Sequence, residues 1–265
     1  MKRLRFVLTL VLVTVFIASG AMFVHQLLDY RAGDAAYEEA VEIAKLPEPV
    51  TKTPETPAEV SEQTTADPTP EPSAEPPTDS LASIDLAALQ AVNADVLGWL
   101  SIPNTAISYP LVQGTDNDYY LFHTWNRSSS AVGAIFMDAR CFSDRSGFNT
   151  IIYGHRMNNG SMFASLKYYS DQSYWQTHPR IYLVDASGSH TYDIYTAYEV
   201  STEGEAYRLS FPDDADRQAF LDDGLSRSVL STGITPQVSD RVLTLSTCTG
   251  RGHATRWVVQ AIEVS

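Results

Sequence analysis

Residues 242–248 of the chain read Val-Leu-Thr-Leu-Ser-Thr-Cys, and residues 256–264 read Arg-Trp-Val-Val-Gln-Ala-Ile-Glu-Val. Short runs rich in β-branched and apolar residues, separated by a glycine-containing loop, predict two strands joined by a turn. We therefore predict strands over 242–247 and 256–264. If the two strands pair antiparallel, the loop between them returns Arg256 to the same sheet edge as Cys248.

The region from 81 to 265 continues this pattern, and we treat it as one folded domain. Six more short runs punctuated by Gly, Pro and Asn are predicted as strands: 99–103, 106–112, 133–137, 150–153, 180–185 and 191–200. Apolar residues at helical spacing predict helices over 81–97 and 213–230. Because helices and strands do not alternate, we predict a mostly β fold. It is a closed eight-stranded β-barrel with an N-terminal helix and a helix inserted between late strands.

The N-terminus has the composition of a membrane anchor. A basic stretch, residues 1–5, precedes an apolar run over 6–25, which at about 1.5 Å per residue nearly spans a hydrocarbon core of about 30 Å. Basic residues before the run and acidic ones after it favour a cytoplasmic N-terminus and an exported body. A signal peptide cleaved near Ala18-Ser19-Gly20 is the alternative. Residues 26–46 form a juxtamembrane segment that can continue as a helix.

Residues 47–80 differ in composition from the rest of the chain. They hold nine of the 14 prolines, eight acidic residues and one lysine, and account for half of the net charge of −14. Such a segment buries too little apolar surface to fold, so it predicts an extended, disordered linker. The acidic balance also argues against nucleic acid as a partner. Two cysteines in 265 residues form no disulfide framework.

Cys248 is a candidate nucleophile because it ends a strand beside a glycine-rich loop that carries arginines. Reactive thiolates lie in such partly exposed, electropositive settings, although many free cysteines are simply buried. A nucleophilic cysteine needs a proton-transfer partner, which is usually histidine. His155 directly follows the predicted strand 150–153, whereas His253 is a rival because it is close to Cys248 in sequence. His178 and His190 are predicted in surface loops.

Arg256 begins the last predicted strand and can hold a thiolate, orient a carbonyl or stabilise an oxyanion. Arg251 competes for this role. Cys141 is interpreted as structural, with a redox switch as the alternative, because a disulfide to Cys248 would block the nucleophile. The pair Cys248 and His253 has no second pair of ligands, so we predict no metal site and no cofactor.

At these residues the chain resembles the sortases. The run Thr244-Leu245-Ser246-Thr247-Cys248 followed by Arg256 resembles their TLxTC…R signature, and Tyr153-Gly154-His155 resembles their histidine segment. Four more stretches are similar to class B sortases in particular: 93–99, 107–113, 117–121 and 133–138. The resemblance covers residues 90–264, and the ordered set of motifs is specific although each motif alone is weak.

This resemblance implies a cysteine transpeptidase on an eight-stranded barrel, on the outer face of a Gram-positive cell membrane. Such enzymes cleave a sorting motif near the C-terminus of a secreted protein, hold the fragment as a thioester, and pass it to an amine of a peptidoglycan precursor or a pilin. Carried over, Cys248 is the nucleophile, His155 the general acid and base, and Arg256 the oxyanion-stabilising residue. The positions that correspond to the peptide groove are Asn117, Leu121, Ser246 and Thr247.

Two other classes of function remain open from the residues. One is a membrane-tethered cysteine peptidase, in which water resolves the thioester instead of an amine. The other is a non-enzymatic surface adhesion module on a stalk, for which the grouping of Cys248, His155 and Arg256 would be a coincidence.

Overall fold

A computed structural model of the chain describes residues 2–46, 81, 83–250, 252 and 254–264. The predicted linker 47–80 and the rival residues Arg251 and His253 lie outside these ranges. The described strands are β1 (Val96–Ser101), β2 (Ser108–Val112), β3 (Ile135–Met137), β4 (Asn149–Tyr153), β5 (Arg180–Asp185), β6 (Gly188–Ser201), β7 (Val242–Cys248) and β8 (Thr255–Glu263).

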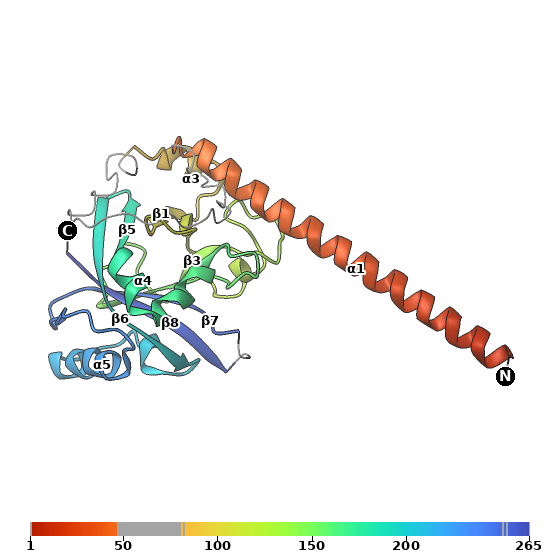
Figure 1. The fold of residues 1–265 in the computed structure, drawn as a ribbon. Helices are drawn as coiled ribbons and strands as arrows, with labels where there is room; N and C mark the ends of the chain where they lie inside the picture. The colour runs from red at the N-terminus through yellow and green to blue at the C-terminus, as the bar shows by residue number, and fades with distance from the viewer. Residues whose placement is uncertain (1, 47–80, 82, 251, 253, 265) are drawn as a thin grey trace, which may run out of the picture.

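The eight strands close into a barrel in the order β1-β2-β3-β4-β7-β8-β6-β5, which confirms the predicted fold class (Figure 1). The β2–β3 and β4–β7 pairs are parallel and the other six are antiparallel. The predicted pairing of the last two strands is present, with Cys248 opposite Arg256. Because β4 and β7 are parallel, the residues that follow each of them lie at one edge of the barrel.

Side chains alternate along β7 between the barrel interior and its outer face. Leu243 and Leu245 are fully buried in the main core, together with Ile152 of β4 and Val259 of β8. The intervening residues of β7 point outward, under a layer formed by 3-10 helix η3 (Glu205–Tyr207) and α5 (Asp214–Arg227). Alternating polarity in β7 therefore reflects two buried layers instead of one buried and one solvated face.

The inserted helix α5 confirms the helix predicted over 213–230. Asp213 caps it by accepting a hydrogen bond from the amide of Asp216, and its apolar face puts Phe220 and Leu221 against Val242 of β7. This packing fixes α5 over the outer face of the strands that lead to Cys248 and Arg256.

The other helices differ from the prediction. Only α3 (Leu86–Val92) is helical within 81–97, because the side-chain amide of Asn93 at its end donates to the hydroxyl of Tyr120 and the carbonyl of Trp125. A short 3-10 turn, η1 (Tyr119–Leu121), follows β2. Two further helices, η2 (Phe163–Ser170) and α4 (Gln172–Thr177), were not predicted; they depend on distant partners such as the carbonyl of Ile194, which Trp175 binds.

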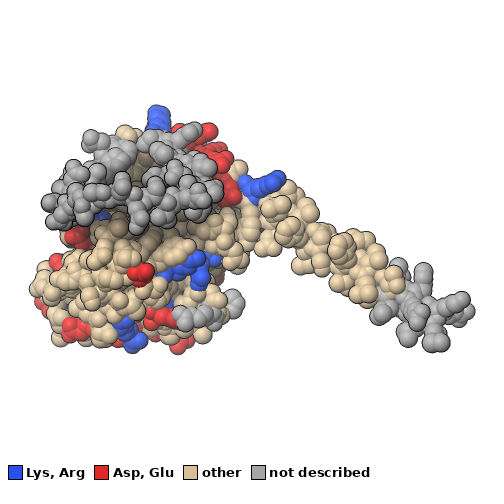
Figure 2. Space-filling model, viewed as in Figure 1, with Lys and Arg blue, Asp and Glu red and all other residues tan. Residues whose placement is uncertain are grey.

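Helix α1 (Lys2–Ile43) extends from the barrel as a single rod (Figure 1). Residues 6–28 contain no Lys, Arg, Asp or Glu, and Figure 2 shows the described outer part of the rod without charge colours. Among the described residues it is the one helix whose length and composition would allow it to cross a membrane. Its other half lies on the barrel, where Ala36, Ala40 and Ala44 are buried.

Candidate active site

The parallel pair β4–β7 brings the sequence-predicted residues together. Tyr153 is level with Ser246 in this pair, so the continuing chains place His155 level with Cys248, just beyond the sheet. On the other side of β7, Cys248 is paired with Arg256 of β8. All three side chains are half-buried. A thiol, an imidazole and a guanidinium thus share one barrel edge and remain accessible.

The ring of His155 has a defined orientation. Its Nε2 lies 2.8 Å from the carbonyl oxygen of Leu121, and because a carbonyl only accepts, Nε2 carries the proton and donates. The second ring nitrogen, Nδ1, is then the atom that can take up or release a proton. Gly133 lies against this ring: a Cβ there would stand 2.8 Å from Cδ2 of His155.

The loops that follow β4 and β7 are joined to each other. The hydroxyl of Thr247 donates to the carbonyl of Gly154 over 2.8 Å, and the guanidinium of Arg156 donates to the carbonyl of Thr249. These two bonds lie on either side of His155 and Cys248 in sequence. They fix the spacing of the two backbones, which is the condition for proton exchange between an imidazole and a thiol.

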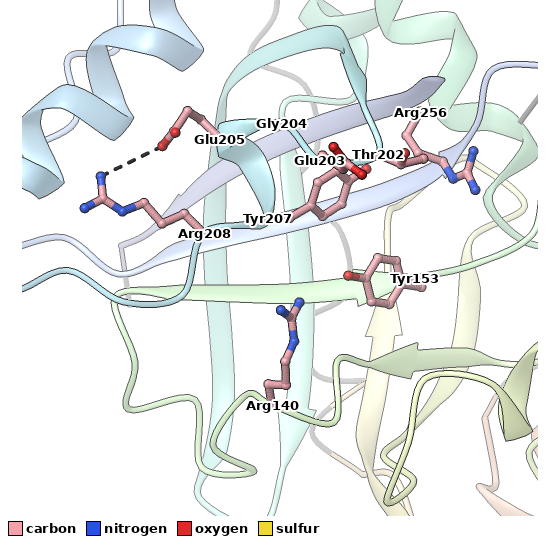
Figure 3. Close-up of a pocket in the computed structure, with 9 residues that line it drawn as sticks. All are labelled: Arg140, Tyr153, Thr202, Glu203, Gly204, Glu205, Tyr207, Arg208 and Arg256. Carbon is pink, nitrogen blue, oxygen red and sulfur yellow. Dashed lines mark ion pairs between the residues drawn. The ribbon is translucent and has the colours of Figure 1, made fainter. Parts of the chain in front are cut away.

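A cavity of about 460 Å³ opens beside Arg256 (Figure 3). Its wall comes from β4, the segment after β3, the β6–η3 connection and β8. The lining residues are Arg140, Tyr153, Thr202, Glu203, Gly204, Glu205, Tyr207, Arg208 and Arg256. The rings of Tyr153 and Tyr207 are stacked at 6.3 Å, and the cavity carries both cationic and anionic side chains. A cleft of this size next to a thiol suits an extended peptide better than a single small metabolite.

One wall of the cavity is held by the buried carboxylate of Asp138. Arg140 donates to both of its oxygens, over 2.9 and 2.7 Å, and the hydroxyl of Tyr153 donates over 2.8 Å. Burial by itself raises the pKa of Asp138, but the hydrogen bonds, above all those from Arg140, outweigh it and lower the pKa to about 2. The carboxylate is therefore ionised at neutral pH and orients both side chains at the cavity.

The four predicted groove residues have different surroundings. Ser246 is buried, and its hydroxyl lies 2.8 Å from that of Tyr207, which lines the cavity. The side-chain oxygen of Asn117 accepts from the amide of Ala139, beside the Asp138 network. Leu121 contributes its carbonyl to His155, and the hydroxyl of Thr247 is occupied by Gly154.

Sequence reasoning missed Tyr153, Tyr207 and Arg140 as cavity residues. Tyr153 was quoted only within the histidine segment, although its position in β4 on the same face as Ile151 was readable from strand alternation. Tyr207 lies in a connection with no regular pattern, and its contact with Ser246 joins residues 39 positions apart. No local signal marked that contact.

Other candidate residues lie away from this edge. His190 was predicted in a loop but belongs to β6, where its ring nitrogens lie near Glu263 and Asp185. Cys141 accepts from the amide of Ile151, and burial raises its pKa to about 11, so it remains a thiol at neutral pH. Both cysteines are free. Across the ranges that the structure describes, no three His, Cys, Asp or Glu side chains gather as a metal site.

A closed barrel with this edge of Cys, His and Arg defines a cysteine transpeptidase of the sortase type. The sortase domain family matches residues 100–264, so the chain belongs to the sortase family. Within that family it is a class B sortase. Sortase B of Listeria monocytogenes is 37% identical over 164 residues, which are 62% of this chain and 67% of the relative. Sortase B of Staphylococcus aureus is 29% identical over 61% of this chain and 66% of the relative.

Solved structures agree with this assignment. The S. aureus sortase B–substrate complex superposes with a TM-score of 0.65 at 33% identity, covering 68% of this chain and 84% of that one. Sortase B of B. anthracis in complex with AAEK1 reaches a TM-score of 0.70 at 29% identity, covering 90% and 99%.

Proposed function

We propose that this class B sortase is anchored in a membrane by α1 and transfers secreted proteins to an amine acceptor through a thioester on Cys248. The observation that carries the proposal is the direct pairing of Cys248 with Arg256 at the edge where His155 follows the parallel strand β4. The thiol, its proton-transfer partner and a fixed cation are the three groups that acyl transfer from a peptide requires.

In the first step the thiolate of Cys248 attacks the carbonyl carbon of the scissile peptide bond. The carbonyl oxygen becomes an oxyanion, which Arg256 stabilises. When the C–N bond breaks, protonated His155 gives its Nδ1 proton to the leaving amine. The products are a thioester on Cys248 and the released C-terminal fragment of the substrate.

In the second step the acceptor amine attacks the thioester carbon. His155 takes the amine proton at Nδ1, the C–S bond breaks and Cys248 leaves as a thiolate, which restores the enzyme. The hydrogen bond from Nε2 to Leu121 supports this assignment of Nδ1 in both steps, since it holds the other nitrogen in the donor role.

The proposed substrate is a sorting motif near the C-terminus of a secreted protein, bound in the cavity beside Arg256. Two relatives support a peptide: the S. aureus enzyme was solved as a substrate complex, and a sortase B was solved in complex with triglycine. Asn117, Leu121, Ser246 and Thr247 lie along or next to this groove. The acceptor class is an amine of a peptidoglycan precursor or a pilin.

The proposed location is the extracellular face of a Gram-positive cell membrane, with the N-terminus in the cytoplasm. The uncharged stretch 6–28 within α1 and the basic residues before it support this orientation. We propose residues 81–265 as the catalytic domain, 6–25 as the span and 47–80 as a solvated acidic segment.

The test incubates the full chain, in detergent or nanodiscs, with a library of sorting-motif peptides and follows intact mass. We expect an acyl adduct that is absent in Cys248→Ala, is retained in the matched control Cys141→Ser, and passes to an added peptide amine. Loss of the adduct to water alone would indicate a peptidase. No adduct with any peptide would contradict the proposed function.

A further inference from the structure

The membrane-proximal half of α1 is bound to the segment that also holds His155. The indole of Trp125 donates to the carbonyl of Ala36 over 2.6 Å, and the amide of Ala131 donates to the carboxylate of Asp29 over 2.9 Å. The hydroxyl of Tyr37 donates to the carbonyl of Gly133 over 2.6 Å. The helix is therefore fixed at three points on residues 125–133.

Gly133 is the point where this docking meets the active site. Its φ of +65° is in the left-handed region, and a Cβ would stand 2.8 Å from both Cδ2 of His155 and the carbonyl oxygen of Leu121. The residue that accepts the bond from Tyr37 thus packs on the imidazole, and it also touches the carbonyl that the imidazole binds. A shift of Gly133 would change the position of both.

A second set of contacts leads from Tyr37 to the backbone of His155. The ring of Tyr37 meets that of Tyr109 edge to face, with centroids 5.1 Å apart. The hydroxyl of Tyr109 accepts from the amide of Met162, and the next amide, that of Phe163, donates to the carbonyl of His155. Tyr37 thereby supports the ring of His155 from one side and its backbone from the other.

We propose that Tyr37 is a positioning residue for His155, so that α1 is both the anchor and a part of the active-site support. This inference rests on the proposed function, because it assigns to His155 the proton transfer described above. Burial raises the pKa of Tyr37 far above its usual range, so the phenol stays a neutral donor at any physiological pH. The bond to Gly133 is thus present throughout the working range of the enzyme.

The test compares Tyr37→Phe with Tyr30→Phe in the full chain in nanodiscs. Tyr37→Phe keeps the ring contact with Tyr109 but removes the bond to Gly133. Tyr30 lies two turns earlier on the same helix, and its hydroxyl accepts from Gln26 at an exposed position, which makes it a matched control. We expect kcat to fall about threefold to tenfold in Tyr37→Phe with KM within twofold, and no change in Tyr30→Phe.

A spectroscopic readout separates positioning from a purely structural role. In ¹³C-labelled protein the Cδ2 shift of a neutral histidine differs between its two tautomers, and the His155 signal is assigned by its loss in His155→Gln. We expect one Nε2–H form in the wild type and a mixture in Tyr37→Phe. An unchanged His155 signal together with unchanged kcat in folded Tyr37→Phe would overturn the inference.

The two proposals fail differently. If the wild type transfers no peptide, the proposed function is wrong, while the tautomer of His155 still tests the role of Tyr37. If the wild type is active and both Tyr→Phe variants behave alike, the positioning role is wrong and the transpeptidase stands.

Discussion

The middle and the end of β7 use the same outer face in different ways. Thr244 is fully buried, and its hydroxyl donates to Asn149 and accepts from Gln260, which in turn accepts from two tyrosines. Four residues on, Cys248 is half-buried and faces Arg256. The layer of α5 and η3 reaches Ser246 through Tyr207, and the catalytic candidates lie beyond this contact.

This difference shows how one strand serves both stability and chemistry. The polar groups in the middle are saturated with partners, and Asn149 also donates to the carbonyls of Ala206 and Arg208. Those two residues flank Tyr207 in sequence. The buried network therefore holds the cavity wall in place, while the end of the strand keeps its reactive groups accessible to a substrate.

The largest expected effect lies at the end of the strand. Cys248→Ser retains the side-chain shape but replaces the thiol with a hydroxyl that is far weaker as a nucleophile at neutral pH. We expect transpeptidation to fall by at least about 10³-fold, with the melting temperature unchanged within about 2 °C. Product formation and thermal unfolding measure the two quantities. A clear fall in melting temperature would show that this end also contributes to stability.

In the middle of the strand the effect should be on stability. Gln260→Leu keeps the volume but leaves the hydroxyls of Tyr195, Tyr198 and Thr244 without their shared partner. We expect the free energy of unfolding to fall by about 2–4 kcal/mol, measured by urea denaturation. Gln218→Leu, at an exposed position on α5, is the control and should change it by less than about 0.5 kcal/mol. Equal losses would remove the contrast between the two regions.

The wall opposite Tyr207 should respond to pH. Because the pKa of Asp138 is about 2 in the folded chain, below the ordinary value of 3.8, its ionised form stabilises the fold above about pH 4. Asp138→Asn should therefore cost about 2 kcal/mol at pH 7. This difference from the wild type should shrink as the pH falls from about 4 toward 2.

Unfolding free energies of both proteins across this pH range measure the change. Asp222→Asn, at an exposed position on α5, is the control and should show no such convergence. A gap between wild type and Asp138→Asn that stays constant from pH 7 to pH 2 would contradict the assigned ion pairing.

The smallest effect is expected at the boundary of the two regions. Tyr207→Phe and Ser246→Ala each remove one side of a 2.8 Å contact at the cavity. A double-mutant cycle on kcat/KM should give a coupling energy of about 0.5–1 kcal/mol. Strict additivity would mean that the pair does not support bound peptide.

Much of the fold was readable from local sequence. All eight strands were predicted within a few residues, since alternating burial is a local pattern with a period of two. The helix over 163–177 was missed because its aromatic residues, such as Tyr169 and Trp175, are held by the carbonyls of His178 and Ile194 and not by a helical repeat. The catalytic candidates were readable through their order along the chain.

The sequence by itself determined the strands, the apolar N-terminal stretch and the identity of the residues at the candidate site, because each depends on neighbours within a few positions. Only the tertiary structure decided that β4 and β7 are parallel, that Tyr207 and Arg140 wall the cavity, and that Tyr37 reaches Gly133 across 96 residues. These contacts depend on closure of the barrel and docking of α1. They join segments whose separation along the chain gives no local signal.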